Sequence, residues 1–268
     1  SVEAECFGST IRVSDEEVPT VIGKVVSSLE DAEALNVPAA GSGRTKLYID
    51  AIKKASKAIT DRPILAGAIG PFSLTGRLMD VPEAMIYFYE EPDMVHEVLK
   101  KATSFITAYC HAFKTAGANG VLLAEPLAGL LSPDLAREFS SDYVKEIIGA
   151  LQDDEFKVFY HNCGNSTIPQ IESILSTGAE LIHFGNAIDM REMLPLIPPN
   201  IVVGGNIDPA GQFKNGTPDS IREETTRLLT DCGTYPNFLI SSGCDIPPLS
   251  NWENIVAFLD AVDTYYKK

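Results

Sequence analysis

Short apolar runs alternate with longer amphipathic stretches from about Arg62 to the end of the chain. Apolar runs of this length are typical of buried strands in a parallel sheet, and the amphipathic stretches are typical of the helices that cover it. We therefore predict six strand–helix units in an α/β fold. The expected strands are residues 63–70, 120–126, 156–164, 181–185, 201–206 and 237–245.

Helices are expected between these strands. Gly117 stands where a glycine commonly follows the last helical residues, which marks the end of the longest helix. One helix is expected to begin at Val81, and a longer one to run from Asp93 to about Ala116. A third covers about 133–152, a fourth ends near Thr177-Gly178, and a short fifth is closed by Pro195. The last two are expected over 219–232 and 252–266.

The first sixty residues fit this pattern poorly. Residues 6–13 are expected to form a short strand or one arm of a hairpin, and residues 18–35 and 44–59 are expected to form helices. Six units are two short of a closed (β/α)8 barrel. Either the sheet is open and doubly wound, or the beginning of the barrel lies upstream of Ser1. No linker or internal repeat divides the chain, so residues 1–268 are predicted to form one domain.

Polar side chains stand where the predicted strands end. In α/β folds the loops that leave the carboxyl ends of the strands carry the chemistry. Asp208 has an alternative role as a helix cap, and His183 as a buried core histidine. The strand-end residues are Glu125, His161, Cys163, His183, Asn206, Asp208, Cys244 and Asp245, of which His183, Asn206, Asp208 and Asp245 are the candidate substrate-binding residues.

His161 and Cys163 are two residues apart, so both side chains point to one face of an extended strand. Together with Cys244 they form a set of one imidazole and two thiolates, which suits Zn²⁺ with a fourth position open for chemistry. Water, Glu125 or a substrate thiol are the candidates for that position. Simple core packing of the same residues is the alternative, because cysteine is also a common core residue.

Composition narrows the function classes. The formal net charge is −16, and such an acidic surface disfavours binding to nucleic acids and to anionic membranes. No apolar run reaches the length of a membrane span, and the first residues lack the pattern of a signal peptide. Five cysteines without a framework spacing favour a reducing compartment. We therefore expect a cytoplasmic protein.

The chain resembles the uroporphyrinogen decarboxylase superfamily, and within it the cobalamin-dependent methyltransferases. The resemblance covers nearly the whole chain from about Cys6. It implies a (β/α)8 TIM-type barrel whose first two strands are absent from this chain. The motifs that carry it are Gly70-Pro71-Phe72-Ser73-Leu74, Glu125-Pro126 through Leu131-Ser132-Pro133, His161-Asn162-Cys163-Gly164-Asn165, Gly205-Asn206-Ile207-Asp208-Pro209 and Gly243-Cys244-Asp245-Ile246-Pro247-Pro248.

The branch is indicated by the metal pattern. The decarboxylases have a tyrosine about where Arg77 falls, a histidine where Cys244 falls, and no His-x-Cys pair. The methyltransferases resemble this chain at His161, Cys163 and Cys244, which implies that these residues bind catalytic zinc. Asp245 follows the last cysteine where a small residue is usual, which points to a different pocket.

The resemblance implies an enzyme that moves a methyl group between a corrinoid, carried by a partner protein, and a small-molecule acceptor. Zinc would hold a thiol acceptor as a thiolate that attacks the methyl group in line, and Glu125 would occupy the fourth zinc position at rest. Coenzyme M and tetrahydrofolate are both acceptors in the branch. The alternatives are a decarboxylase or other lyase acting on a tetrapyrrole, and a non-catalytic protein that binds a corrinoid or a metal.

Overall fold

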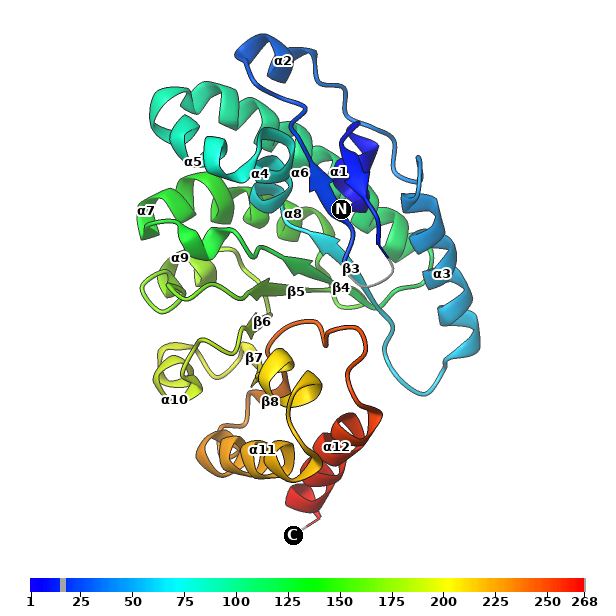
Figure 1. Ribbon diagram of the computed structural model, residues 1–268, viewed down its shortest axis with the longest axis vertical. Coiled ribbons are helices and arrows are strands. Elements are labelled where there is room, and N and C mark those ends of the chain that lie inside the picture. Colours follow the sequence, from blue (N-terminus) through cyan, green and yellow to red (C-terminus); the bar gives the residue numbers. More distant parts are fainter. Residues whose placement is uncertain (15–17, 268) are drawn as a thin grey trace.

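The predicted apolar runs form one parallel sheet in the computed structural model, which describes residues 1–14 and 18–267 (Figure 1). Each strand pairs with the next one along the chain, so the sheet order follows the sequence. The α/β class expected from the sequence is confirmed. The strands are β3 (Leu65–Ile69), β4 (Gly120–Ala124), β5 (Lys157–Asn162), β6 (Leu181–Phe184), β7 (Val202–Ile207) and β8 (Phe238–Ser242).

Helices connect the strands and cover one face of the sheet (Figure 1). The longest helix ends as predicted, because Gly117 adopts a φ of +100°, a conformation that favours glycine over other residues. The helices are α4 (Pro71–Met79), α5 (Val81–Glu90), α6 (Pro92–Thr115), α7 (Pro133–Ala136), α8 (Asp142–Leu151), α9 (Ile171–Ser176), α10 (Met190–Met193), α11 (Pro218–Cys232) and α12 (Trp252–Tyr266). Short 3₁₀ turns η1 (Ala128–Leu130) and η3 (Leu194–Leu196) and π-helical turns η2 (Arg137–Ser141) and η4 (Pro209–Lys214) complete the connections.

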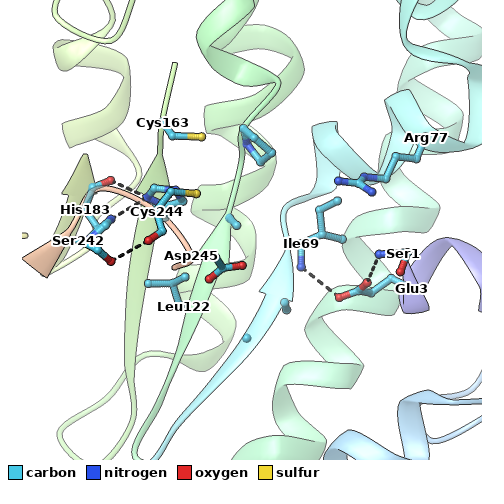
Figure 2. A pocket seen from close by; sticks show the side chains of 15 residues that line it. Ser1, Glu3, Ile69, Arg77, Leu122, Cys163, His183, Ser242, Cys244 and Asp245 are labelled. Atoms are coloured by element: carbon cyan, nitrogen blue, oxygen red, sulfur yellow. Dashed lines mark hydrogen bonds and ion pairs between the residues drawn. The ribbon is translucent and has the colours of Figure 1, made fainter. Parts of the chain in front are cut away.

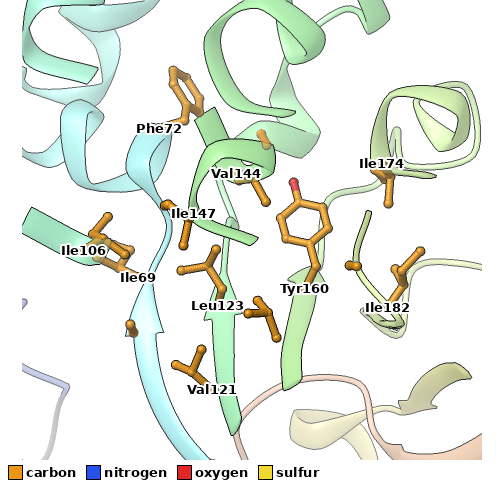
Figure 3. Close-up of a cluster of buried hydrophobic side chains, with 14 of the residues drawn as sticks. Ile69, Phe72, Ile106, Val121, Leu123, Val144, Ile147, Tyr160, Ile174 and Ile182 are labelled. Carbon is orange, nitrogen blue, oxygen red and sulfur yellow. The ribbon is translucent and has the colours of Figure 1, made fainter. Parts of the chain in front are cut away.

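The core lies between the sheet and its helices. Val121 and Leu123 of β4 and Tyr160 of β5 are almost fully buried and face the helices (Figure 3). Val144 and Ile147 of α8 pack in the same cluster. Because side chains alternate along a strand, the residues between these point to the other face of the sheet. That other face carries the cavity described below.

The N-terminal segment differs in part from the prediction. The expected strand within residues 6–13 is β1 (Thr10–Arg12), and the helix expected over residues 44–59 is α3 (Thr45–Ala58). The helix predicted over residues 18–35 is wrong. That stretch forms β2 (Thr20–Ile22), which pairs antiparallel with β1, and then only the short α2 (Leu29–Ala34). Residues 15–17 of the segment before β2 lie outside the described residues. A short helix, α1 (Val2–Cys6), was not expected.

The sheet is not closed into a ring by hydrogen bonds between β3 and β8 in the part of the chain that the structure describes. Both edge strands expose a large apolar side chain, Leu65 at 42% and Leu239 at 50%. Six successive parallel strands match the count predicted for a barrel without its first two strands. Among the described helices, none combines the length and the apolar character needed to cross a membrane.

Candidate metal centre and its cavity

Three predicted ligands meet at the carboxyl ends of the strands. His161 is the fifth residue of β5, Cys163 follows that strand directly, and Cys244 lies two residues beyond β8. Their ligand atoms all lie within 4.8 Å of one another. Since β6 and β7 separate β5 from β8 in the sheet, the curvature of the sheet must bring the two strand ends together.

His161 is held by one ring nitrogen and leaves the other without a partner. The residue is 4% exposed. Nδ1 of His161 lies 3.2 Å from the backbone oxygen of His183 and 2.8 Å from Nδ1 of the His183 ring. Its Nε2 is buried and has no hydrogen-bond partner among the described residues. An orphaned buried nitrogen is costly unless a ligand satisfies it, and here two thiols lie beside it.

His183 is fixed in turn by its other ring nitrogen. Its Nε2 lies 2.7 Å from the hydroxyl oxygen of Ser241, and that hydroxyl lies 3.0 Å from the backbone oxygen of Ser242. Burial, followed by the neighbouring His161 ring, lowers the pKa of His183 to about 4. Gly204 leaves room for the ring, because a Cβ at that position would lie 2.9 Å from Cδ2 of His183.

The two thiols are electrostatically coupled. The contact with Cys163, followed by the contact with His161, holds the pKa of the Cys244 thiol well below its usual range. The pKa of Cys163 is raised by the contact with Cys244 and by burial. One thiolate therefore forms readily in this pair, and the thiolate is the form that binds metals.

A cavity of about 470 Å³ opens beside the three ligands (Figure 2). Such a volume is ordinary for a small-molecule site. His183 and Asp245, both predicted as substrate-binding residues, line it. Arg77 of α4 extends into it from the side opposite Cys163 and Cys244 (Figure 2). Among the described residues Arg77 has no hydrogen-bond or ion-pair partner, and it is the one Lys or Arg side chain that lines this cavity.

Glu125 does not lie with the three ligands, so its predicted place in the fourth zinc position needs correction. The carboxylate is fully buried on the helix side of the sheet. It accepts hydrogen bonds from the backbone N–H of Phe72, at 2.7 Å, and from the backbone N–H and hydroxyl of Ser73, at 2.9 and 2.6 Å. Glu125 therefore anchors the first turn of α4. Burial raises its pKa to about 7, against the lowering effect of these hydrogen bonds.

Asn206 and Asp208 also lie away from this cavity. The side chain of Asn206 donates to the backbone oxygens of Gly185 and Ile188, at 2.9 and 2.6 Å, and so fixes the loop after β6. The carboxylate of Asp208 accepts from two backbone N–H groups at the start of η4, each at 2.9 Å. Of its two expected roles, Asp208 has that of a cap. The structure therefore gives both residues positions that stabilise loops rather than line this cavity.

Sequence reasoning missed Arg77 and Ser241 as site residues. Arg77 lies one to two turns into a helix, so no strand-end position marks it. Ser241 lies inside β8, and its role depends on the orientation of the His183 ring. Only three-dimensional packing shows either contribution.

The fold and the site together define an α/β protein with a cysteine- and histidine-lined cavity at the carboxyl ends of its parallel strands. The sequence model of the uroporphyrinogen decarboxylase (URO-D) family matches residues 1–265, so the chain belongs to this family.

Proteins similar to this chain include both a methyltransferase and a decarboxylase, the two activities considered in the sequence analysis. A methylcobamide:CoM methyltransferase, MtbA, of Methanosarcina acetivorans is 29% identical over 270 residues, which cover 99% of this chain and 77% of that protein. A uroporphyrinogen decarboxylase of Coxiella burnetii is 28% identical over 260 residues, covering 92% and 70%. The first of these similarities supports the resemblance to the methyltransferase branch.

Solved structures point the same way. A methyltransferase from Methanosarcina mazei superposes with a TM-score of 0.88 at 26% identity, covering 99% of this chain and 78% of that one. A B12-independent methionine synthase from a Shewanella species has a TM-score of 0.58 at 16% identity, covering 93% of this chain and 72% of that one. The second likeness concerns the fold alone.

Proposed function

We propose that this chain is a zinc-dependent methyltransferase that moves a methyl group between a corrinoid and a small thiol-type acceptor. One observation carries the proposal: His161 has a buried, unpartnered Nε2 and offers a ligand atom within 4.8 Å of the thiols of Cys163 and Cys244, beside a cavity that all three residues line. Similarity to the methylcobamide:CoM methyltransferase supplies the class of methyl donor.

The donor set fits zinc. Tetrahedral Zn²⁺ takes thiolates at about 2.3 Å and imidazole nitrogen at about 2.0–2.1 Å, which sets the ligand atoms roughly 3.5–3.8 Å apart. The three ligand atoms already lie within 4.8 Å of one another, so small side-chain rotations suffice to reach that spacing. Three protein ligands leave one position for a substrate, as in catalytic zinc sites. When bound, the metal would supply a charge that keeps an acceptor thiol deprotonated at neutral pH.

The chain's own residues then orient the acceptor. Arg77 faces the three ligands across the cavity and has no partner of its own among the described residues. A guanidinium pairs well with carboxylate, sulfonate or phosphate groups. We therefore expect an acceptor with a thiol at one end and an anionic group at the other. Asp245 lies near Cys244 and disfavours an anion at the metal end of the cavity.

The partner would be a corrinoid-carrying protein that docks where the cavity opens, over the loops at the strand ends. All five cysteines are free, and this favours a reducing compartment, the cytoplasm, as the place where the enzyme works.

Metal analysis of the purified protein tests the site. We expect about one zinc per chain, lost in Cys163→Ala and retained in Cys232→Ala, which removes a buried thiol of α11 far from the cavity. A wild-type protein without zinc after loading and dialysis would refute the proposed metal site. Equal zinc content in Cys163→Ala would refute the proposed ligand set.

Methyl transfer tests the reaction. With free methylcobalamin and a thiol, the methyl group passes to sulfur, the thiol proton goes to solvent, and both bonding electrons stay on cobalt as cob(I)alamin, which has a distinct absorption. We expect turnover with 2-mercaptoethanesulfonate or 3-mercaptopropionate and much less with 2-aminoethanethiol. Arg77→Gln should raise KM for the anionic thiols roughly 10- to 100-fold, the size of one lost charge-assisted contact, and leave 2-mercaptoethanol unaffected. A protein that binds zinc but transfers a methyl group to no thiol would favour the alternative of a non-catalytic protein that binds a corrinoid or a metal.

The decarboxylase alternative has a direct test, since a relative of that name is almost as similar as the methyltransferase. Loss of carboxyl groups from a tetrapyrrole substrate, by protein that binds no zinc, would favour it. We expect no such loss, because two thiols and an imidazole offer soft metal ligands rather than groups that grip several carboxylates.

A further inference from the structure

A chain of hydrogen bonds leads from the metal position to a backbone carbonyl. It runs from Nδ1 of His161 to Nδ1 of His183 at 2.8 Å, from Nε2 of His183 to the hydroxyl of Ser241 at 2.7 Å, and from that hydroxyl to the oxygen of Ser242 at 3.0 Å. Every nitrogen and oxygen along it is used except Nε2 of His161.

The backbone oxygens of Ser242 and His183 decide which atoms donate along this series of hydrogen bonds, because a carbonyl oxygen can only accept. Ser241 donates its single proton to the oxygen of Ser242, so the hydroxyl accepts from Nε2–H of His183. A neutral His183 ring protonated on Nε2 must then accept at Nδ1. At the other end, the oxygen of His183 lies 3.2 Å from Nδ1 of His161 and also calls for a donor there.

Both ends therefore require a proton on Nδ1 of His161, which leaves the lone pair on Nε2. We propose that Ser241 and His183 are positioning residues that hold His161 in its Nδ1–H tautomer and so direct its Nε2 lone pair to the metal between Cys163 and Cys244. The identity of the metal as zinc rests on the proposed function, but the tautomer does not.

His161 is held by more than the single hydrogen bond to the backbone oxygen of His183, because the His183 ring and Ser241 also take part. His161 could contact the oxygen of His183 alone, but the His183 ring would then be free to turn and to offer a proton to Nδ1 of His161. Ser241 prevents this by holding the proton of His183 on Nε2. Residues that orient a metal-bound histidine in this way commonly change metal affinity 10- to 100-fold.

The tautomers can be measured directly in the metal-free protein. Long-range ¹⁵N–¹H NMR spectra distinguish protonated from unprotonated ring nitrogens, and only four histidines need assignment. We expect protonated Nδ1 for His161 and protonated Nε2 for His183 in the wild type. In Ser241→Ala both rings should become tautomeric mixtures, and Ser241→Thr, which keeps the hydroxyl, should restore the wild-type pattern.

Zinc affinity, measured by competition with a chromophoric chelator, gives the second readout. We expect Ser241→Ala to bind zinc 10- to 100-fold more weakly and Ser241→Thr to bind it nearly as tightly as the wild type. Ser176→Ala is the matched control, since its hydroxyl also donates to a backbone oxygen, that of Ser173 at 2.7 Å, but away from the site. It should leave both the affinity and the tautomers unchanged. His183→Asn repeats the test should Ser241→Ala fold poorly.

The outcomes separate the two proposals. A wild-type His161 protonated on Nε2 would overturn the positioning role, and so would a Ser241→Ala protein with unchanged tautomers and unchanged zinc affinity. The expected tautomers in a protein that never binds zinc would support the positioning of His161 while refuting the proposed function.

Discussion

At the scale of single residues, Glu125 shows how the parity of a strand decides the role of a side chain. Leu122, Ala124 and Pro126 line the cavity, so Glu125 points to the opposite face, toward α4. His161 of β5 and Cys163, which directly follows that strand, both line the cavity and so have the cavity-facing parity. A carboxylate at a strand end can therefore join the other ligands only if its side chain points to the same face of the sheet as theirs.

Glu125 should make the stability of the metal-free protein depend on pH. Burial raises its pKa from 4.5 to about 7 in the folded chain, so the folded state binds more protons than the unfolded state between these values. The free energy of unfolding must then fall as pH rises through this window, by up to roughly 3 kcal/mol in total. Glu125→Gln cannot ionise, so its unfolding free energy should lack this decline.

Urea unfolding of both proteins between pH 4.5 and 8, with a chelator present, measures the difference. Glu125→Gln carries a constant loss, because an amide cannot accept from all three donors that the carboxylate uses. Ser73→Ala serves as a control: it removes one of these donors, should raise the pKa further, and should steepen the wild-type decline. Parallel pH profiles for wild type and Glu125→Gln would mean that the donors at the start of α4 fully offset the effect of burial.

The proximity of the three proposed ligands could be predicted from sequence, whereas their surroundings could not. His161 and Cys163 share a strand face by spacing alone, and Cys244 follows another strand of the same parallel sheet. Which residue faces them from across the cavity depends on how α4 is placed, and so Arg77 was missed. The alternation of side chains along β4 would have excluded Glu125 as a metal ligand. Applying that alternation, however, requires knowing which residues of β4 face the cavity, and the sequence alone does not show this.

At the scale of elements, prediction worked where hydrophobic patterning is strong. All six strands of the parallel sheet were found, because each is a short and largely apolar run. The N-terminal segment has no such run. Residues 18–35 resemble a helix in composition, yet Pro19 and Gly23 flank the short β2, and α2 begins only after Ser28 caps it. That the whole chain forms one domain stays a prediction.

The two faces of β4 should respond differently to the same substitution. Leu123 is fully buried against the helices, whereas Leu122 lines the cavity and is only partly buried. We expect Leu123→Ala to lower the free energy of unfolding by about 2–5 kcal/mol, because it leaves a void in packed core. Leu122→Ala should cost about 1 kcal/mol, since less apolar surface returns to water.

Denaturant unfolding of the two variants, side by side, provides the measurement. Leu122→Ala enlarges the cavity, so its effect is expected on acceptor KM rather than on stability. Equal losses of stability would mean that the cavity face of the sheet is packed in solution, contrary to its exposure here.

At the scale of the whole molecule, one apolar surface has no cover. Trp252, Val256 and Leu259 are spaced along one face of α12 and are 76%, 50% and 56% exposed, and Tyr266 near its end is 60% exposed. The opposite face of α12, with Ala257, is fully buried.

The exposed face of α12 should tolerate polar side chains if nothing covers it in solution. Trp252→Gln and Leu259→Gln replace exposed apolar groups, so each should change the free energy of unfolding by no more than about 0.5 kcal/mol. Ala257→Gln makes the same replacement on the buried face of the same helix, where an amide must be forced into packed core, and should cost more than about 2 kcal/mol. Unfolding curves recorded at several protein concentrations complete the test. A large loss in Trp252→Gln that shrinks on dilution would show that a second copy covers this face, because dimer formation stabilises the wild type only at high concentration. A large loss that does not depend on concentration would show that the chain itself covers it.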